Sequence, residues 1–514
     1  MRPRPACGVD VAALCLLALL SGLILCRQLG GGSLAGDEAI YAQVGREASR
    51  GALLPLRYLG TIYLHKPPLF PALVGLGFRL LGVSELAARL PAALSGVALV
   101  LLVYLAGAAL FSRRAGFVSA LVLLTNFHLL FTHGLRKAVA DGPLTLLLSA
   151  ALLLYLHHRT GPAVALSGRS RASVVVACGL LLGLGLLLKS AVALLGVGVV
   201  GLFVGIFPLP KEAGLLSPRR CRDPLLLTAV ALALFLPWLA AMELATHGAY
   251  ARYLFGVDLL ARATRGIDPG HVQRGLYSKV LLADFRWKLL LLLPVPFFLV
   301  WRARMPVSGR RPELERVAFL SLWIAVVLGG FSAAASQLPW YIYPAYPALA
   351  LLLGWSVEGL YRLLSRPSRA FRVVGLLWLV VVGVVLARGL WRSWRAAGED
   401  VAEVDAKRIA VYLHHLGNPL TCVQPGTEMR EWNAYYLLPL CRRYVYGPAD
   451  ASGCELVLTP WPEGYLPPEQ LARRARRVSK YDPREGDVWL LNLRRDLPAE
   501  ILHAPAPRPE VSFN

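Results

Sequence analysis

The chain has 514 residues, 56% of them hydrophobic, a formal net charge of +23 and a mean hydropathy of +0.55. A soluble globular protein of this length is normally less apolar, so the composition excludes that class and favours a membrane protein. The positive charge does not indicate nucleic-acid binding, because Arg and Lys gather in the short connections between apolar blocks.

Apolar blocks that approach the roughly 20 residues needed to cross a bilayer recur along the chain. They predict eleven membrane spans, at residues 9–26, 90–111, 115–132, 138–158, 172–188, 191–208, 224–243, 281–302, 317–335, 340–361 and 371–391. The first block follows Arg2 and Arg4 in the manner of a signal peptide. No small-residue cleavage site follows it, so we expect an uncleaved span.

Basic residues orient these spans. With the N-terminus in the cytoplasm, every inside connection is basic, through Arg113 and Arg114; Arg159, Arg169 and Arg171; Lys211, Arg219, Arg220 and Arg222; Arg302, Arg304, Arg310, Arg311 and Arg316; and Arg362, Arg366, Arg369 and Arg372. This pattern predicts a multi-pass protein of the bacterial inner membrane, with residues 27–89, 133–137, 244–280 and 336–339 outside.

Two alternatives exist for residues 172–208. They could form one long helix with Lys189 in its middle, or two short passes that turn at Lys189. A single pass would place the basic residues of 211–222 outside, against the charge rule, so we expect two passes.

The first outer loop carries an acidic pair, Asp37 and Glu38, close to the first span. Carboxylates in this position are costly to bury unless they have a partner or a function. One interpretation is a general base or a cation site. The other is that both carboxylates stabilise the N-terminus of a helix that starts near Ala39.

Lys66 lies later in the same loop and precedes Pro67 and Pro68, which stiffen the backbone. An ammonium fixed in this way can hold a phosphate as a point charge, although a lysine that extends to the lipid headgroups is the alternative. Residues 68–82 are apolar but short and rich in Pro and Gly, which predicts an interfacial or re-entrant helix.

Further polar residues gather at the predicted outer ends of later spans. Asp141 follows Arg136 and Lys137, and either faces a cavity or pairs with one of these cations. Tyr341 belongs to a Trp- and Tyr-rich segment that suits the membrane interface. A mostly cationic set, suited to an anionic lipid headgroup, comprises Arg252, Asp258, Arg262, His271, Asp284, Arg286 and Lys288.

The composition becomes polar and Pro-rich after Arg395, which predicts a small α/β domain outside the membrane over residues 396–514. Helical spacing covers 399–416, and strands are expected at 455–459 and 487–493. One disulfide is expected in this oxidising compartment, but the spacing leaves its pairing open among Cys422, Cys441 and Cys454.

Taken in order, these motifs resemble the PMT/aminoarabinose-transferase-like glycosyltransferases of the GT-C membrane class. The matching residues are Asp37-Glu38 with Tyr41-Ala42, Lys66-Pro67-Pro68, Arg136 with Asp141 and Pro143-Leu144, Leu187-Leu188-Lys189, and Leu338-Pro339 with Tyr341 and Pro344. The resemblance covers roughly residues 10–360. It implies an all-α membrane domain over residues 1–395, a polyprenyl-phosphate-linked sugar as donor, and transfer to lipid A, another envelope glycan or a protein.

By this resemblance, Asp37 is the expected catalytic base, with Glu38 and Asp141 as further acidic residues of the site. Contacts to the donor phosphate are expected from Lys66, Arg262 and Tyr341, and more loosely from Lys189 and Arg136. A divalent metal on Asp37, Glu38 and Asp141 remains an open alternative, because the sequence does not require one.

Some positions depart from the family pattern. Gln337 stands where many relatives carry Lys, which removes one cation near the donor, and Ser190 replaces a common Gly. Phe70-Pro71 and Arg286 also differ from the usual residues. These departures concern the sugar and the acceptor more than the reaction class. Eleven spans fit the protein-mannosyltransferase branch better than the longer lipid A branch.

Two other functions remain as alternatives. A transporter or lipid-linked-sugar flippase would carry charges near mid-membrane and an internal repeat, whereas here the charges lie at the outer ends and we find no repeat. A sensor that acts through its C-terminal domain would leave Asp37, Lys66 and Asp141 without a role.

Overall fold

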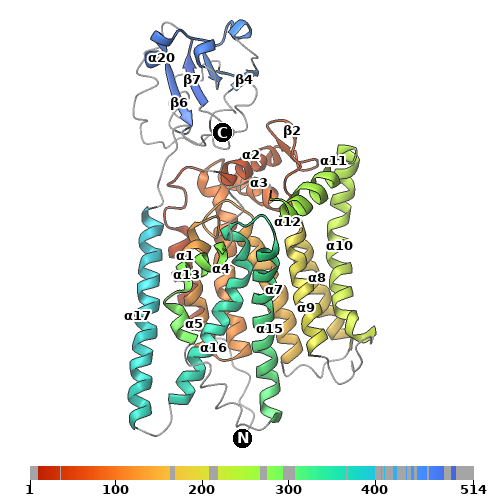
Figure 1. Cartoon of the computed structure of the whole chain (residues 1–514), viewed down its shortest axis with the longest axis vertical. Coiled ribbons are helices and arrows are strands. Elements are labelled where there is room, and N and C mark those ends of the chain that lie inside the picture. Colours follow the sequence, from red (N-terminus) through yellow and green to blue (C-terminus); the bar gives the residue numbers. More distant parts are fainter. Residues whose placement is uncertain are drawn as a thin grey trace. The chain divides into compact units, whose positions relative to one another are not determined.

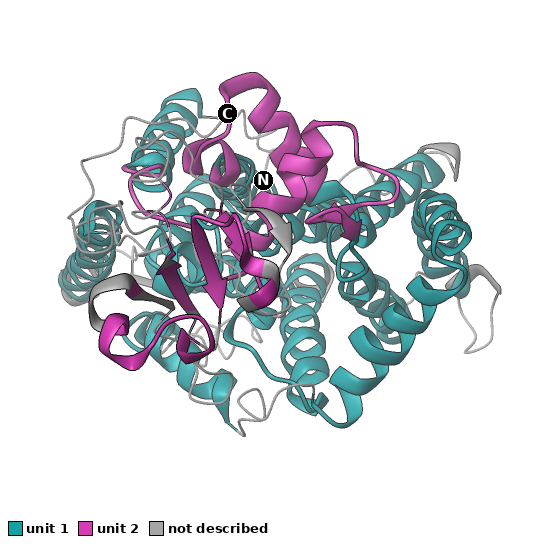
Figure 2. Cartoon of the chain, turned by 90° about the horizontal axis from the view of Figure 1, so that it is seen from above, with its two compact units in different colours: residues 1–27, 62–70, 90–399 teal, residues 28–61, 71–89, 400–514 magenta. Residues whose placement is uncertain are grey.

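The structure is a computed structural model of the chain. It describes residues 10–34, 36–161, 168–207, 218–266, 275–292, 307–364 and 369–399, together with 407, 410, 421–424, 436, 441–444, 448–459, 462–479 and 488–493. The described part is mostly helical. It divides into two compact units, drawn in different colours in Figure 2: residues 1–27, 62–70 and 90–399, and residues 28–61, 71–89 and 400–514.

The helices of the first unit follow the apolar blocks of the sequence (Figure 1). They are α1 (Val11–Cys26), most of α4 (Glu85–Leu110), α5 (Arg113–Leu124), α6 (Phe127–Phe131), α7 (Asp141–Thr160), α8 (Gly168–Lys189), α9 (Leu195–Ile206), α10 (Pro218–Thr246), α11 (Ala249–Ala251), α12 (Arg262–Thr264), α13 (Leu276–Phe285), α15 (Val307–Ala333), α16 (Tyr346–Leu364) and α17 (Arg369–Glu399). Helix α8 packs against α7 and α10, and α5 packs against α16.

Shorter segments of other helix types join them. A π-helix, η4, covers Arg252–Ala261, and 3₁₀ segments cover η2 (Ser190–Leu194), η6 (Lys288–Leu292) and η7 (Pro339–Ala345). Single-turn π-bulges in other proteins are frequent at functional sites, so the longer η4 is a candidate location for a functional site.

Within the described residues, five helical stretches are long and apolar enough to cross a membrane: Glu85–Leu110, Arg171–Ile206, Cys221–Thr246, Pro312–Ala333 and Val373–Glu399. The expected total of eleven spans therefore stays a prediction, although every predicted span contains helical residues.

The chain reverses direction between α8 and α9, as the two-pass interpretation expected. Ser190 has a positive φ of 53°, and η2 separates the two helices. A Cβ added to Gly196 would lie 2.8 Å from the side chain of Leu182. Fourteen residues of continuous helix would separate these positions by about 21 Å, so only a turn brings them together.

One predicted span is broken where the sequence suggested a continuous helix. Residues 115–132 form α5 and α6, which are separated at Thr125 and Asn126. The buried ammonium of Lys288 donates to the Thr125 carbonyl at 3.1 Å and hydroxyl at 3.0 Å, and also to the Asn126 side chain. The Thr125 carbonyl can accept this bond because α5 ends there, whereas in an unbroken helix it would accept from the amide four residues later.

The second unit combines residues 28–61 and 71–89 with the C-terminal segment, residues 400–514. It contains α2 (Asp37–Ser49), the strand β1 (Arg57–Tyr58), part of β2 (Thr61–Ile62) and most of α3 (Leu69–Leu81). The predicted helix at 68–82 is thus confirmed as α3.

The C-terminal segment holds a five-stranded mixed sheet in the order β4-β3-β5-β7-β6. Its strands are β3 (Thr421–Val423), β4 (Cys441–Tyr444), β5 (Leu456–Thr459), β6 (Ala475–Ser479) and β7 (Val488–Asn492), with η9 (Pro448–Ala451), η10 (Pro462–Gly464) and α20 (Pro468–Arg474) beside them. Strands β3, β4 and β5 are parallel, whereas β7 runs antiparallel to β5 and β6. Strands β5 and β7 confirm the predictions at 455–459 and 487–493, but most of the predicted helix at 399–416 lies outside the described residues.

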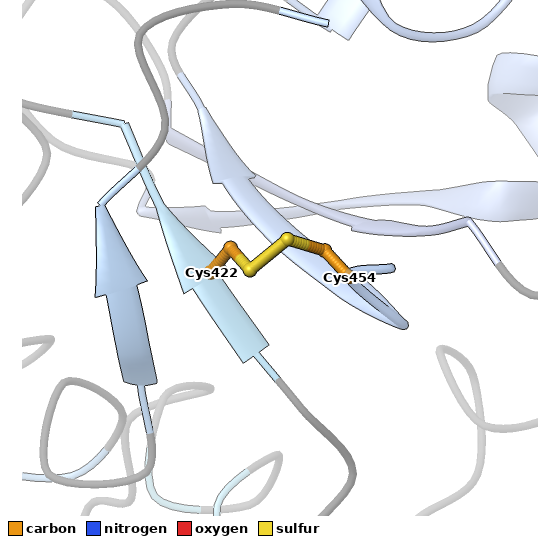
Figure 3. The surroundings of a disulfide bond; sticks show 2 residues. All are labelled: Cys422 and Cys454. Carbon is orange, nitrogen blue, oxygen red and sulfur yellow. A yellow bond between two sulfur atoms is a disulfide. The ribbon is translucent and has the colours of Figure 1, made fainter. Parts of the chain in front are cut away.

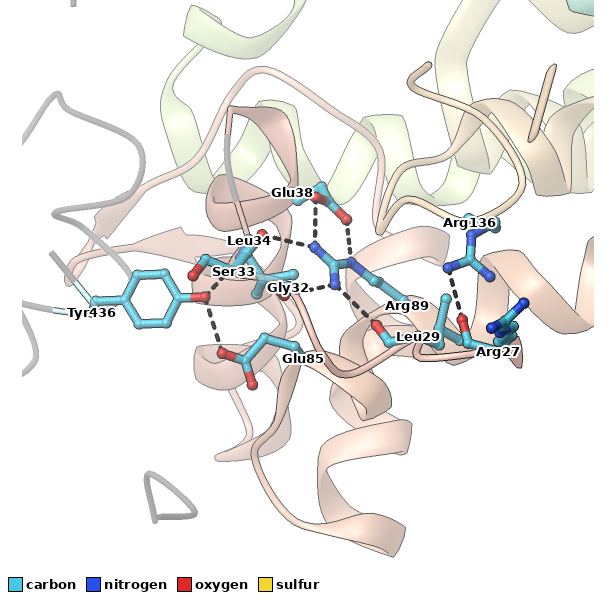
Figure 4. Close-up of polar contacts among 10 residues, drawn as sticks. All are labelled: Arg27, Leu29, Gly32, Ser33, Leu34, Glu38, Glu85, Arg89, Arg136 and Tyr436. Carbon is cyan, nitrogen blue, oxygen red and sulfur yellow. Dashed lines mark hydrogen bonds and ion pairs between the residues drawn. The ribbon is translucent and has the colours of Figure 1, made fainter. Parts of the chain in front are cut away.

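The sequence predicted one disulfide but not which cysteines form it. In the structure, the bond joins Cys422 on β3 to Cys454 just before β5 (Figure 3). Cys422 is fully buried and packs with Val457 in a small hydrophobic core. The same unit contains Tyr436, whose hydroxyl accepts a hydrogen bond from the amide of Leu34 at 2.7 Å and donates to Glu85 at 3.1 Å (Figure 4).

Candidate functional site

Three of the predicted site residues come together in the first unit around a carboxylate, that of Asp258. The ammonium of Lys66 lies 3.3 Å from the Oδ1 atom of Asp258, and the Nε atom of Arg262 donates to the same oxygen at 2.9 Å. The guanidinium of Arg262 also donates to the hydroxyl of Tyr341 at 3.0 Å. Two cations therefore contact a single carboxylate, and one of them, Arg262, also holds the phenol of Tyr341.

One backbone contact and one side-chain contact hold these residues in place. The amide of Ser336 donates to the carbonyl of Arg262 at 2.9 Å, which ties the segment before η7 to the end of η4. On the other side, the hydroxyl of Tyr253 lies 2.6 Å from the Nδ1 atom of His65, next to Lys66. The short segment with Lys66 is thus attached to η4 at two consecutive residues.

The charge of Asp258 is stabilised by its surroundings. Burial raises the pKa of its carboxyl, but the charges and hydrogen bonds of Lys66 and Arg262 outweigh this effect and hold the pKa below its usual range. The carboxylate therefore stays ionised at neutral pH, and it balances one of the two positive charges.

A second ion pair lies at the N-terminal end of α7. The ammonium of Lys189 forms a close contact with the Oδ1 atom of Asp141, and the Nδ1 atom of His133 lies 3.2 Å from the Oδ2 atom. Asp141 begins α7, where a carboxylate is favoured by the helix dipole. Lys189 also lies over the ring of Tyr341, 5.3 Å from its centroid.

Most of these groups, but not Asp141 or His133, line one cavity of about 350 Å³. Its polar lining residues include Lys66, Lys189, Asp258, Arg262 and Tyr341. The remaining wall is largely apolar and includes Leu186, Leu232, Phe235, Leu236, Leu239 and Leu254. The cavity therefore suits a molecule with an anionic group and a hydrocarbon chain.

Asp37 and Glu38 belong to the second unit, so their placement against this cavity stays a prediction. Both lie in the first turn of α2, where carboxylates stabilise a helix. Glu38 is buried against Arg89, with distances of 2.7 and 3.0 Å between their polar atoms (Figure 4). Asp37 is only partly buried.

The guanidinium of Arg136 is bound to backbone carbonyls of α1, of the segment that follows α1, and of α17. It is 2% exposed, and its guanidinium donates to the carbonyls of Ile24, Leu25, Arg27 and Ala397 at 2.7 to 3.3 Å. Figure 4 shows its contact with Arg27. These bonds fix the end of α1, and they favour a structural role for Arg136 over binding of a phosphate.

The sequence placed Asp258 in a polar loop but did not assign it to the site. Its spacing of four residues from Arg262 was the available signal, since residues four apart meet on a helix. His271 lies outside the described residues. Among the described residues, no group of three or more His, Cys, Asp or Glu side chains is arranged to hold a metal ion.

The chain is similar to known glycosyltransferases. Residues 65–240 match the family model for dolichyl-phosphate-mannose-protein mannosyltransferases. A relative from Edwardsiella ictaluri, an undecaprenyl phosphate-alpha-4-amino-4-deoxy-L-arabinose arabinosyl transferase, is 31% identical over 67% of this chain and 58% of its own length. One with the same name from Aeromonas salmonicida is 29% identical over 79% and 70%. The chain thus spans less than two thirds of the first of these relatives.

Solved structures share the fold. The ArnT protein of Cupriavidus metallidurans bound to undecaprenyl phosphate aligns with a TM-score of 0.65 and 20% identity, over 95% of this chain and 99% of that one. The archaeal oligosaccharyltransferase AglB of Archaeoglobus fulgidus aligns with a TM-score of 0.58 and 14% identity, over 95% and 74%. The family model is named for mannosyl transfer, whereas these relatives are named for arabinosyl transfer. The comparisons therefore point to both branches, and the preference for the protein-mannosyltransferase branch, which rested on eleven spans, stays a prediction.

Proposed function

We propose, from the premise that this chain is a PMT/aminoarabinose-transferase-like protein of the GT-C class, that it is an integral-membrane glycosyltransferase. It moves a sugar from a polyprenyl-phosphate donor to an envelope lipid, glycan or protein. The reaction takes place at the extracytoplasmic face of the bacterial inner membrane.

One observation carries the proposal: a single cavity combines a cationic end with apolar walls. Lys66 and Arg262 provide two positive charges against the one negative charge of Asp258, so the cluster retains a net positive charge for a phosphate. The leucine- and phenylalanine-lined remainder suits the polyprenyl chain. Similarity to relatives that are named for an undecaprenyl-phosphate sugar supports the same donor class.

In the proposed reaction, the acceptor hydroxyl attacks the anomeric carbon from the side opposite the phosphate. The bond between that carbon and the phosphate oxygen breaks, and the carboxylate of Asp37 takes the hydroxyl proton. The products are a glycosylated acceptor with inverted anomeric configuration and a polyprenyl phosphate. Lys66 and Arg262 offset the negative charge that grows on the leaving phosphate.

Asp37 is the base in this proposal because the family resemblance places the catalytic carboxylate at this position, whereas Glu38 forms a buried ion pair with Arg89. A positioned carboxylate contributes about 10²–10⁴-fold as a general base. We therefore give Glu38 and Arg136 structural roles, and we assign Lys66, Arg262 and Tyr341 to the donor phosphate.

The test is transfer by the purified protein from a polyprenyl-phosphate sugar to candidate acceptors. Asp37→Asn should lower kcat by about 10²–10⁴-fold with donor binding retained. Lys66→Ala should raise the KM for the donor, whereas Lys279→Ala, which changes an exposed lysine outside the cavity, should leave it unchanged. Wild-type turnover in both Asp37→Asn and Lys66→Ala would show that this site assignment is wrong.

Mass spectrometry of envelope lipids, glycans and proteins from a deletion strain identifies the sugar and the acceptor. The species that lacks one sugar relative to the parent strain is the product of this enzyme. An unchanged envelope, together with accumulation of a lipid-linked sugar on one face only, would favour a flippase instead.

A further inference from the structure

His133 is a residue that the sequence did not assign to the site. It lies in the turn between α6 and α7, and its backbone has a positive φ of 54°. This left-handed conformation is uncommon for residues other than Gly, with Asn, Asp and His among those that adopt it more readily. The turn therefore holds His133 in a specific orientation.

Two contacts of the His133 side chain bear on the site. Its Nδ1 atom lies 3.2 Å from the Oδ2 atom of Asp141. Its ring stacks on that of Trp340, with centroids 4.0 Å apart and an angle of 13° between the planes. The side chain is 16% exposed, so most of its surface is covered.

Asp141 contacts one lining residue of the donor cavity, and Trp340 is adjacent in sequence to another. The other oxygen of Asp141 holds Lys189, a lining residue of the cavity, and Trp340 precedes Tyr341, another lining residue. His133 does not itself line the cavity among the described residues. It thus contacts Asp141 through a ring nitrogen and Trp340 through the ring face, and each of these residues is next to a group that lines the cavity.

The turn that carries His133 is itself anchored. The hydroxyl of Tyr343 donates to the carbonyl of His128 at 2.7 Å and also contacts the carbonyl of Thr132. Tyr343 lies on η7, the same segment as Trp340 and Tyr341. The turn and η7 are therefore joined at two places, through Tyr343 and through the stacked rings.

We propose that His133 is a positioning residue for the donor phosphate. It orients Asp141 by a hydrogen bond and η7 by stacking, and so places the Lys189 ammonium and the Tyr341 hydroxyl at the cavity wall. This inference deepens the proposed function and rests on it, because it concerns the same donor site.

The test compares three substitutions by steady-state transfer kinetics. His133→Asn keeps a donor near the Nδ1 position and tolerates the positive φ. His133→Gln cannot place its amide there, and His133→Ala removes both partners. His247→Ala is the matched control, because His247 is exposed and also has a positive φ, of 49°.

A positioning role predicts that His133→Ala and His133→Gln raise the KM for the donor about tenfold, the effect of losing one aligned hydrogen bond near a charged group. The value of kcat should change less than about threefold. His133→Asn, which keeps the hydrogen bond but loses the stacking on Trp340, should recover part of the donor affinity. A purely structural role would lower the active fraction and hence kcat, at an unchanged KM.

An unchanged KM in His133→Ala, or a His133→Asn variant no better than His133→Ala, would overturn the proposal. Binding of polyprenyl monophosphate to the detergent-solubilised protein is measured in parallel. If the wild type binds this probe but transfers no sugar, the proposed reaction fails, and the effect of His133→Ala on binding still decides the role of His133.

Discussion

At the scale of single residues, Asp258 shows what the sequence could and could not reveal. The four-residue spacing to Arg262 is visible in the sequence, but Lys66 is 192 positions away. The cationic character of the site could be predicted from residue types. The carboxylate that holds two of those cations together depends on a long-range contact, which no local pattern encodes.

Replacement of Asp258 by Asn should weaken donor binding. Loss of the charge leaves Lys66 and Arg262 to repel each other and to lose their orientation, so we expect the KM for the donor to rise about tenfold. Lys279→Ala is the control, because Lys279 is exposed and lies outside the cavity. A donor KM that does not change in Asp258→Asn would remove Asp258 from the site.

The pH dependence follows from the sign of the pKa shift. Because the pKa of Asp258 is lowered in the folded protein, its ion pairs stabilise the fold above the ordinary carboxyl pKa of about 3.9 and are lost as the pH falls through the lowered value. Donor KM values measured between about pH 5 and pH 8 should therefore show no titration step that Asp258→Asn abolishes. Such a step would contradict the assigned ion pairs.

Glu38 and Arg89 give a second prediction at this scale. Their side chains are only 5% and 4% exposed, and Arg89 also donates to the carbonyls of Leu29, Gly32 and Ser33. Arg89→Ala leaves a buried carboxylate without its cation, which costs about 3–5 kcal/mol. We expect a clear fall in the thermal unfolding temperature in detergent, whereas the exposed Arg79→Ala should have little effect.

At the scale of helices, hydropathy predicted where helices occur but not where they break. At the interruption between α5 and α6, the Thr125 carbonyl accepts a hydrogen bond from Lys288, which lies 163 residues later in the chain. The turn between α8 and α9 was predicted because the charge rule left only one consistent path. The sequence around Thr125 gives no comparable indication of the break, because the lysine that binds there is far away in the chain.

Close helix packing gives a prediction at this scale. Helices α5 and α16 meet at Gly354, where an added Cβ would lie 2.3 Å from the carbonyl oxygen of Ala115 and 2.2 Å from the hydroxyl of Ser119. Small residues allow such approaches in membrane helices. Gly354→Ala should therefore lower thermal stability, by about 1–3 kcal/mol for overpacking.

Gly383→Ala is the matched control for this experiment. Gly383 lies on α17, another apolar helix, and a Cβ there would meet nothing within 4 Å. We expect the control to be neutral or stabilised by up to about 1 kcal/mol, since Ala favours helix. Equal melting temperatures for the two variants would show that α5 and α16 are not packed this closely.

At the scale of the whole molecule, composition and charge predicted a membrane domain and a separate C-terminal segment. They did not predict that residues 28–61 and 71–89 join that segment in one compact unit. The contacts responsible, such as those of Tyr436 with Leu34 and Glu85, connect polar groups far apart in the chain. Local composition marks where a chain leaves the membrane, but not which of the emerging parts associate.

The disulfide tests the orientation of the chain. If the C-terminal segment lies outside the cytoplasm, Cys422 and Cys454 should be oxidised in native membranes, because bonds of this kind persist in that compartment. Peptide mapping without reductant should recover the linked pair. The double variant Cys422→Ser/Cys454→Ser should lose about 3–4 kcal/mol of stability in this segment. Free thiols at both positions in native membranes would place the segment in the cytoplasm.

The contacts of Tyr436 also set an order for biosynthesis. Glu85 leaves the ribosome 351 residues before Tyr436, a delay of roughly 20 to 70 seconds at bacterial elongation rates. Lys407, which pairs with Glu85 at 2.9 Å, is likewise made late. The apolar helices are therefore synthesised before Glu85 can acquire these partners. A ribosome that stalls near residue 400 would leave behind a membrane-inserted chain whose first loop is unfinished, and such a chain is a natural substrate for quality-control proteolysis.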